Sequence, residues 1–167
     1  MSTIFSVNEF DVKPVTSADF DSTLKVYEQC EDFLSLGPVP KASKEMVQAD
    51  IDHSISSNGI FCGIWDKTGV QVGVLDFIPE MEEGTAFLSL LMISGHCRYG
   101  GIGTAILAEL ESHLTANYKT IILKSGVQTN NAIGIKFWKK CGFILDKEPT
   151  AIDDGTVAYQ MQKRLNK

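Results

Sequence analysis

Apolar residues along the chain follow two different spacings. Continuous or alternating apolar stretches, which are typical of strands, lie at 11–15, 60–65, 70–78, 87–93, 120–127 and 157–161. A helical spacing recurs in the stretches that begin near residues 17, 44, 101 and 131. The order is strand, two helices, three strands, helix, strand, helix and one or two further strands. It predicts an α/β (α+β) fold built on one mixed sheet.

Polar and turn-forming residues mark the ends of these segments. Thr16 lies three residues before Asp19, which is the spacing of a helix cap. Ser43 is placed to cap the second helix. The stretch 30–43 breaks the helical spacing with two prolines and a glycine, so we expect a structured connection there rather than a helix.

Length, charge and cysteine spacing limit the class of protein. The 167 residues contain no repeat or linker, so we expect a single domain over 1–167. The net charge is −6 and the one basic block, 163–167, reads as a solvated chain end, which argues against nucleic-acid binding. The sequence has no apolar run of membrane-spanning length and no signal-peptide layout, so we expect a cytoplasmic protein without membrane contact. The four cysteines are too widely separated to predict a metal site or a disulfide framework.

A glycine-rich loop connects the apolar stretch 87–93 to the helix that follows. It reads Arg98-Tyr99-Gly100-Gly101-Ile102-Gly103-Thr104. The first turn of a helix presents unpaired backbone N–H groups and the positive end of the helix dipole. Glycines remove the Cβ atoms that would keep an anion away, and Arg98 adds a positive charge. We therefore interpret the loop as a phosphate or pyrophosphate site.

The spacing of the loop distinguishes between kinds of phosphate site. A Walker A loop needs a lysine after its last glycine, where Thr104 stands. A dinucleotide fingerprint that starts at Gly101 needs a small residue where Ile106 stands. The pattern Arg-x-x-Gly-x-Gly does fit, and it resembles the acyl-CoA pyrophosphate loop of the GNAT superfamily of acetyl-CoA-dependent N-acetyltransferases. The simpler alternative is a glycine-rich turn without a ligand.

A second motif strengthens this resemblance. The sequence Asn131-x-x-Gly134-x-x-Phe137-Trp138-x-x-x-Gly142-Phe143 is similar to the GNAT pattern Asn-x-x-Ala-x-x-Phe-Tyr-x-x-x-Gly-Phe. An asparagine at a helix start can cap the helix and still offer its amide to a ligand. With the element order, the resemblance covers nearly the whole chain. It implies a mostly antiparallel central sheet flanked by helices, in which the fourth and fifth strands splay apart around the pantetheine arm of the cofactor.

The resemblance also implies a set of residues that bind acetyl-CoA, and no metal. The loop would hold the pyrophosphate through its backbone N–H groups. The backbone of the preceding strand would pair with the pantetheine and the acetyl carbonyl, where an N–H would act as an oxyanion donor. The implied cofactor-binding residues are Leu91, Met92, Ile93, Arg98, Tyr99, Gly100, Gly101, Ile102, Gly103, Thr104, Asn131, Phe137 and Trp138.

The chain departs from the family at the two positions expected to transfer protons. Trp138 stands where the family has a tyrosine that can protonate the departing thiolate, and Phe87 stands where many members have a glutamate base. An indole does not give up its proton usefully, so we expect Trp138 to shape the catalytic pocket. Asp76, Glu31 or Asp32 could accept the proton of the amine through water. Tyr159 or Tyr99 could replace the missing acid.

The resemblance therefore implies an enzyme that transfers the acetyl group of acetyl-CoA to a primary amine of a small molecule or a peptide. We expect the connection 30–43 and the acidic turn 80–84 to line the acceptor site and to attract a cation. Two alternatives stay open: an acyl-CoA-binding protein of the same fold with little or no transferase activity, and a nucleotide-binding α/β domain whose loop imitates the motif. A homodimer is also left open.

Overall fold

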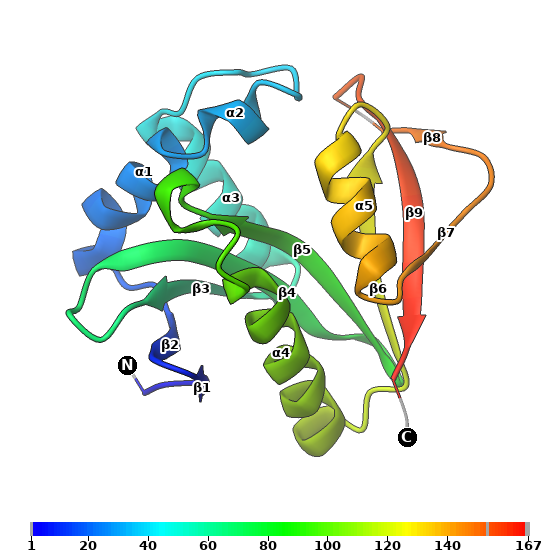
Figure 1. Cartoon of the computed structure of the whole chain (residues 1–167), viewed down its shortest axis with the longest axis horizontal. Helices are drawn as coiled ribbons and strands as arrows, with labels where there is room; N and C mark the ends of the chain where they lie inside the picture. Colours follow the sequence, from blue (N-terminus) through cyan, green and yellow to red (C-terminus); the bar gives the residue numbers. More distant parts are fainter. Residues whose placement is uncertain (1, 153, 166–167) are drawn as a thin grey trace.

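The computed structural model of the chain describes residues 2–152 and 154–165. Its strands are β1 (Phe5–Val7), β2 (Phe10–Pro14), β3 (Ile60–Trp65), β4 (Gln71–Glu82), β5 (Thr85–Ile93), β6 (Ile122–Gln128), β7 (Ile144–Leu145), β8 (Thr150–Ala151) and β9 (Val157–Arg164). Its helices are α1 (Phe20–Glu28), α2 (Glu31–Leu34), α3 (Lys44–Ser56), α4 (Ile102–Tyr118) and α5 (Ala132–Lys140), with short 3₁₀ turns η1 (Ser17–Asp19) and η2 (Gly95–Cys97). In this part of the chain the strands form one sheet in the order β1-β2-β3-β4-β5-β6-β9-β7, with β8 beside β9 (Figure 1).

This architecture confirms the predicted fold class, a mixed and mostly antiparallel sheet flanked by helices. The predicted caps are also present: the Asp19 carboxylate accepts from the Thr16 backbone N–H at 2.8 Å, and the Ser43 hydroxyl accepts from the Met46 N–H at 3.1 Å. The sequence did not predict β1, β7 and β8. The expectation of a connection without helix over 30–43 was wrong in part, because it contains the short helix α2.

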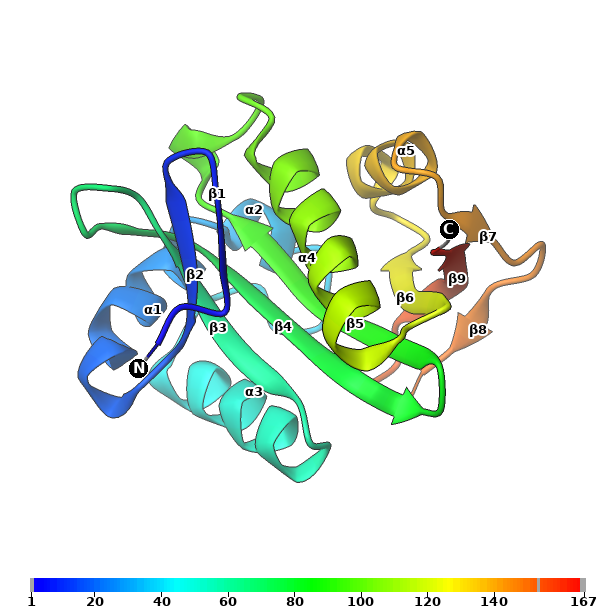
Figure 2. The same ribbon diagram turned by 90° about the horizontal axis from the view of Figure 1, so that it is seen from below.

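Two apolar cores lie on opposite faces of the sheet. On one face α4 packs against the strands, with four fully or almost fully buried residues spaced along one side of the helix: Ile106, Leu107, Leu110 and Leu114. On the other face α1 and α3 cover β3, β4 and β5 around Tyr27, Val47 and Met92. Figure 2 shows α4 crossing the sheet on the side opposite to α3. The two cores hold β5 between them.

β5 runs beside β6 for only part of its length. The two strands pair in parallel from Thr85↔Ile122 to Phe87↔Lys124, and the Ser125 hydroxyl then donates to the Leu88 carbonyl at 2.7 Å. At this point the register of β5 with β4 shifts, because Phe77 pairs with Leu88 whereas Asp76 pairs with Leu90. A bulge of this kind bends the strand that carries it. Beyond it β5 and β6 diverge, as Figure 1 shows, which is the splaying that the resemblance implied.

The last strand is also tied to the body of the molecule. Lys163 of β9 donates to both carboxylate oxygens of Glu111 on α4, at 3.0 and 2.9 Å, and Leu165 is buried. The expectation that 163–167 is a solvated chain end was therefore wrong for Lys163 and Leu165, whereas Arg164 at the end of β9 is exposed. Asn166 and Lys167 lie outside the described residues. No helix in the described ranges is long and apolar enough to cross a membrane.

Candidate active site

The loop before α4 leaves the N-terminus of this helix open. Tyr99 and Gly101 both have positive φ, 67° and 84°, and turn the chain sharply into the helix. The N-cap of α4 is Gly101, which has no side chain to bond the first-turn N–H groups, whereas Ser43 and Asn131 cap α3 and α5. A Cβ added at Gly100 or Gly101 would meet no atom within 4 Å. The backbone here is accessible and polarised to receive an anion.

The outer half of β5 presents backbone groups to the space between β5 and β6. The Ser94 N–H donates to the Val72 carbonyl at 2.9 Å, which continues the ladder of β5 with β4. Because antiparallel ladders alternate, the backbone of Met92 also faces β4, and the N–H and C=O groups of Leu91 and Ile93 face the opposite edge. The Met92 side chain is buried under α1 and α3. Leu91 and Ile93 are therefore the residues that offer backbone bonds to a ligand in this space.

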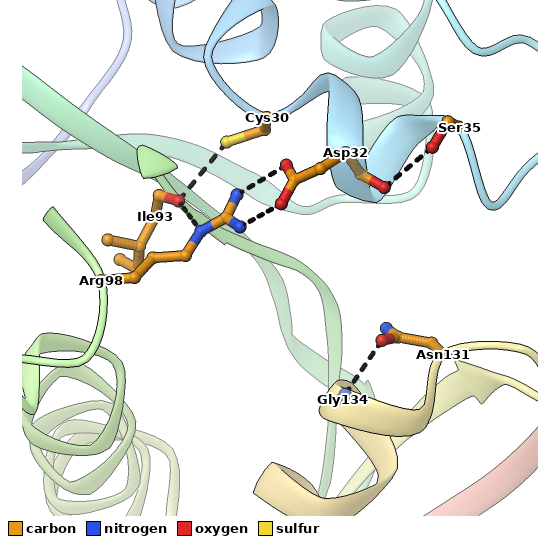
Figure 3. Close-up of polar contacts among 7 residues, drawn as sticks. All are labelled: Cys30, Asp32, Ser35, Ile93, Arg98, Asn131 and Gly134. Carbon is orange, nitrogen blue, oxygen red and sulfur yellow. Dashed lines mark hydrogen bonds and ion pairs between the residues drawn. The ribbon is translucent and has the colours of Figure 1, made fainter. Parts of the chain in front are cut away.

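Asn131 lies across this space, at the start of α5. Its amide oxygen accepts from the Gly134 N–H at 2.9 Å, which leaves the NH₂ group free to donate (Figure 3). A Cβ at Gly134 would lie 2.4 Å from that nitrogen, so this glycine makes room for the observed position of the amide. The structure thus agrees with an asparagine that caps a helix and can also contact a ligand.

The side chain of Arg98 turns away from the open helix end. Its Nε donates to the Ile93 carbonyl at 2.7 Å, and its two terminal nitrogens donate to the two carboxylate oxygens of Asp32, at 2.5 and 3.1 Å (Figure 3). These bonds hold the pKa of Asp32 below its ordinary value and raise that of Arg98. The Cys30 thiol donates to the same Ile93 oxygen at 3.5 Å. The positive charge expected at the phosphate site is therefore paired with Asp32.

The aromatic residues of α5 form one wall. Phe137 lies 3.4 Å from the position that a Cβ of Gly103 would occupy, so it faces the first turn of α4. Trp138 contacts Phe137 and Phe143 edge to face, with ring centroids 4.9 and 5.2 Å apart. It is half-buried and packs against the main core. Its ring therefore packs between Phe137, Phe143 and the main core.

The acidic candidates for proton transfer lie away from the aromatic residues of α5. Asp76 is only 5 % exposed and accepts from the Ser54 hydroxyl at 2.7 Å, beneath α3. Burial raises its pKa from 3.8 to about 6. Glu31 accepts from the Ala42 N–H at 3.0 Å and pairs with Lys41, so it holds the connection between α2 and α3. Tyr99 is 86 % exposed on the loop.

The acidic turn 80–84 lies at the closed end of the sheet. The Gly84 carbonyl accepts from the N–H groups of Ile121 and Ile122, where β5 and β6 are paired. The rest of β5 separates this turn from Ile93 by about 26 Å, since a strand rises about 3.3 Å per residue. The turn therefore lies at the end of the sheet away from the divergence of β5 and β6.

A hollow of about 360 Å³ lies at the open end instead. It is lined by three segments: Leu36–Pro38 after α2, Gln128–Asn130 after β6, and Asp154–Val157 before and at the start of β9. The Asn130 amide donates to the Leu36 carbonyl at 3.0 Å and fixes two of these segments together. The Asp154 carboxylate accepts from the backbone N–H and the hydroxyl of Thr156, which lowers its pKa. Of these segments, the sequence predicted only the one after α2.

A model of the acetyltransferase (GNAT) family matches residues 24–143, which include both motifs. The chain therefore belongs to the GNAT family of acetyltransferases, enzymes that depend on acetyl-CoA as acetyl donor. No curated protein matches the chain. Among the described residues, no group of three or more His, Cys, Asp or Glu side chains could hold a metal ion.

Solved structures share the fold at low sequence identity. An acetyltransferase from Thermus thermophilus is 21% identical with a TM-score of 0.78, over 96% of this chain and 100% of that one. A spermidine N-acetyltransferase from Vibrio cholerae, solved with CoA and spermine, is 10% identical with a TM-score of 0.73, over 94% of this chain and 96% of that one. An acetyltransferase from Salmonella typhimurium that modifies the N-terminal serine of a 50S ribosomal subunit protein is 11% identical with a TM-score of 0.77, over 98% of each chain.

Proposed function

We propose that this protein transfers the acetyl group of acetyl-CoA to a primary amine of a small molecule or a peptide. The observation that carries the proposal is the divergence of β5 from β6 beside the uncapped N-terminus of α4. This arrangement supplies an anion site, a row of free backbone groups and an open end in one continuous surface. The residues present fit an acyl-CoA, because each of its three kinds of group, phosphate, amide and thioester, has a matching partner.

In this proposal the backbone N–H groups of Ile102, Gly103 and Thr104 bind the pyrophosphate. The Ile93 N–H and the NH₂ group of Asn131 bind the pantetheine amides from the two sides of the gap. The Leu91 N–H, farther along β5 from the loop, donates to the thioester oxygen, which gains negative charge as the amine attacks. One preorganised donor at such an oxygen lowers the barrier by about 3 kcal/mol.

We place the acceptor in the hollow at the open end of the gap. Its lining is mostly backbone and uncharged polar groups, with Asp154 as the carboxylate. A single exposed carboxylate favours a compact amine or the N-terminus of a peptide over a molecule that needs many charge contacts. Two of the similar structures are named for amine acceptors of these two kinds, a polyamine and an N-terminal serine.

Proton transfer in this proposal depends on water rather than on a dedicated side chain. Asp76 lies under α3, Glu31 is engaged by Ala42, and Phe87 cannot accept a proton. A neutral amine attacks a thioester readily once it is oriented, so positioning supplies much of the rate. Because the four cysteines are free thiols, two of them buried, we propose a reducing compartment, the cytoplasm, as the place of the reaction.

The same observation supports a second candidate, an acyl-CoA-binding protein with little transferase activity, since neither expected proton-transfer residue is present. Release of CoA thiol, measured over a panel of polyamines, amino acids, aminoglycosides and peptides, tests the first proposal. Calorimetry with CoA, ATP and NAD tests the ligand. Turnover of at least one amine supports the transferase. CoA binding without turnover of any amine supports the second candidate, and binding of ATP or NAD in place of CoA contradicts both.

A further inference from the structure

One face of the sheet is uncovered at β6 and β9. On the other face these two strands contribute Leu123, Val127 and Met161 to the core beneath α4 and α5. The core beneath α1 and α3 contains no described residue of β6 or β9. Figure 2 shows α4 and α5 on one side of the sheet and α3 on the other, beside β3. The side chains of β6 and β9 that alternate with the core residues therefore point to a surface without a helix.

This surface carries polar and small residues. Antiparallel partners lie on the same face of a sheet, so the register of β6 with β9 places three pairs of residues in a row along it. We call these six residues the polar track: Lys124 with Gln162, Gly126 with Gln160, and Gln128 with Ala158. Gln128 also lines the acceptor hollow, so the track and the hollow form one continuous surface.

Gly126 has no structural role that explains it. It is exposed, its φ lies outside the left-handed region, and a Cβ there would lie no nearer than 3.7 Å to another atom. A glycine weakens the strand that contains it, and in a strand it often marks a place where another backbone approaches closely. Gly126 therefore leaves room for a chain that lies on the track.

The glutamines of the track match the chemistry of a peptide backbone. A carboxamide both donates and accepts hydrogen bonds, as a peptide group does. Gln162 is exposed, and Gln128 and Gln160 are half-buried. The amide nitrogen of Gln160 lies 3.9 Å from the position of a Cβ at Gly126, so it stands beside the space that this glycine leaves open.

The charge of the track distinguishes between kinds of amine. Its one charged residue is Lys124, and Arg164 follows Gln162 on the same face. A polyamine carries several positive charges and would be repelled along this face, whereas a neutral or acidic peptide would not. The track therefore fits a peptide better than a polyamine.

The track also reaches the height of the proposed thioester site. Phe87 and Lys124 are the last pair before β5 and β6 diverge. Leu91 lies four residues after Phe87, and Gln128 lies four residues after Lys124, so Leu91 and the stretch 126–128 are about level along the sheet. A chain that lies on Gly126 can therefore present its end to the acetyl group across the edge of β6.

We propose that the acceptor is the N-terminal segment of a polypeptide, bound in an extended conformation along the polar track. Gln128 and Gln160 bond its backbone, and Gly126 lets that backbone lie against β6. The α-amine nitrogen bonds to the acetyl carbon as the carbon–sulfur bond breaks, and the proton that the amine loses ends on the CoA thiol. A backbone this close to the thioester favours an α-amine over a lysine amine, whose long side chain would hold the backbone away. This inference rests on the proposed function and names its substrate class.

The test measures how the rate of acetylation depends on the length of the acceptor. The probes are pools of peptide amides of random sequence with a free N-terminus, one, two, four and six residues long. We expect the initial rate at concentrations below KM to rise about fivefold or more from one residue to four and to level off at six. The reason is that the track from Gln128 to Lys124 spans about 13 Å, which is about four residues of an extended chain. Mass spectrometry of the products should place the acetyl group on the α-amine.

Two variants test the track itself. Gln160→Ala removes an amide, and Gly126→Val fills the space above β6. Each should lower the ratio of the four-residue rate to the one-residue rate about threefold or more. The melting temperature of Gly126→Val should hold or rise, because valine favours strands and a Cβ here makes only ordinary contacts. Gln48→Ala, which changes an exposed glutamine on α3, is the matched control and should leave the ratio unchanged.

The outcomes separate this inference from the proposed function. Absence of acetylation of every amine contradicts the proposed transferase itself. Acetylation of spermidine or of the one-residue amides as fast as the longer peptides contradicts only the role of the track, and so does acetylation of lysine side chains in place of the α-amine. A length dependence that Gln160→Ala and Gly126→Val leave unchanged, in proteins that still bind CoA, would also overturn the inference, because the peptide would then bind elsewhere.

Discussion

At the scale of single residues, Asp76, a candidate proton acceptor from the sequence, lies buried beneath α3. It is a carboxylate within an apolar strand, hydrogen-bonded to Ser54 and close to the Asp50–Tyr27 pair. Burial also raises the pKa of Asp50. Two carboxylates in one buried region favour protonation, because each charge is poorly solvated and repels the other.

The Asp76→Asn variant should therefore be more stable than the wild type at neutral pH. The raised pKa of Asp76, about 6, means that the folded protein binds a proton more tightly than the unfolded chain. The contribution of Asp76 to the free energy of unfolding is greatest at a pH below the pKa that Asp76 has in the unfolded chain. It is lost as the pH rises through the pKa of the folded protein, by up to roughly 3 kcal/mol. Urea unfolding at pH 4.5 and 7.5 measures the free energy of unfolding, and its decrease between the two pH values should be smaller for Asp76→Asn than for the wild type. Asp52→Asn, an exposed change on α3, the helix that covers Asp76, should keep the wild-type decrease. An equal decrease in Asp76→Asn would contradict the argument.

Trp138→Phe should lower kcat only a few-fold. A phenyl ring at position 138 can still pack edge to face against Phe137 and Phe143. Only the indole N–H and part of the packing area are lost. Steady-state kinetics with an accepted amine measure the change in kcat, and calorimetry with CoA measures the change in cofactor affinity. A loss of around a thousandfold in kcat at unchanged CoA affinity would assign the indole a chemical role, and Trp138→Tyr should hold or raise the activity.

At the scale of elements, the helices and strands follow from local signals that a sequence carries. The cap at Ser43, the start of α4 and the strands β3, β5 and β6 were predicted within two residues of their bounds, because apolar spacing and capping chemistry depend on neighbouring residues. β4 continues four residues beyond the predicted end at 78. The strands β7 and β8 have two residues each, too few to show a period. They depend on pairing with β9, which is a contact at long range.

In the candidate site, too, the features that depend on local sequence could be predicted and those that depend on long-range contacts could not. The loop 98–104 and Asn131 could be recognised, because a motif needs specific residue types at fixed spacing. The bond of Arg98 to Asp32 joins residues 66 positions apart, and the hollow draws on three separate segments. No spacing in one sequence encodes such contacts. The location of the turn 80–84 could not be read from the sequence for the same reason, since only the register of β5 with β6 places it at the closed end.

The open N-terminus of α4 can be tested with a matched pair of glycines. Gly101 and Gly69 both have positive φ, 84° and 86°, and a Cβ at either would meet no atom within 4 Å. Glutamate at either position has the same backbone strain, about 1 kcal/mol. Gly101→Glu should abolish CoA binding, because its carboxylate lies where phosphate would bind, whereas Gly69→Glu should bind CoA normally. Unchanged calorimetric affinity in a folded Gly101→Glu variant would contradict the assignment of the loop.

At the scale of the whole molecule, the gap divides the sheet into two parts. One contains β1 to β5, and the other contains β6 to β9 with α5. They are joined by the short parallel pairing of β5 with β6, by the bonds of Lys163 to Glu111 and of Asn130 to Leu36, and by the apolar core beneath α4, to which both parts contribute. A ligand that bonds both sides of the gap would connect the two parts, and it would do so only in the folded protein.

CoA should therefore raise the melting temperature. At about 100 times its dissociation constant a ligand stabilises the folded state by about 2.7 kcal/mol, which is roughly 5–10 °C for a domain of this size. Differential scanning calorimetry over a series of CoA concentrations measures the shift, with Gly101→Glu as the control. Hydrogen exchange should slow at the Leu91 and Ile93 amides. A shift without protection of either amide would place the ligand outside the gap.

The position of β9 has a consequence for how the chain folds. Each of the strands β1 to β5 pairs with the strands next to it in sequence, so this part of the sheet needs no residue beyond β6. β6 gains its antiparallel partner only from residues 158–164. During synthesis the free edge of β6 would stay exposed until β9 has left the ribosome, and an unpaired edge is a template for pairing with another chain. The interval between the synthesis of these two strands is when the nascent protein is most exposed to aggregation and has most need of a chaperone.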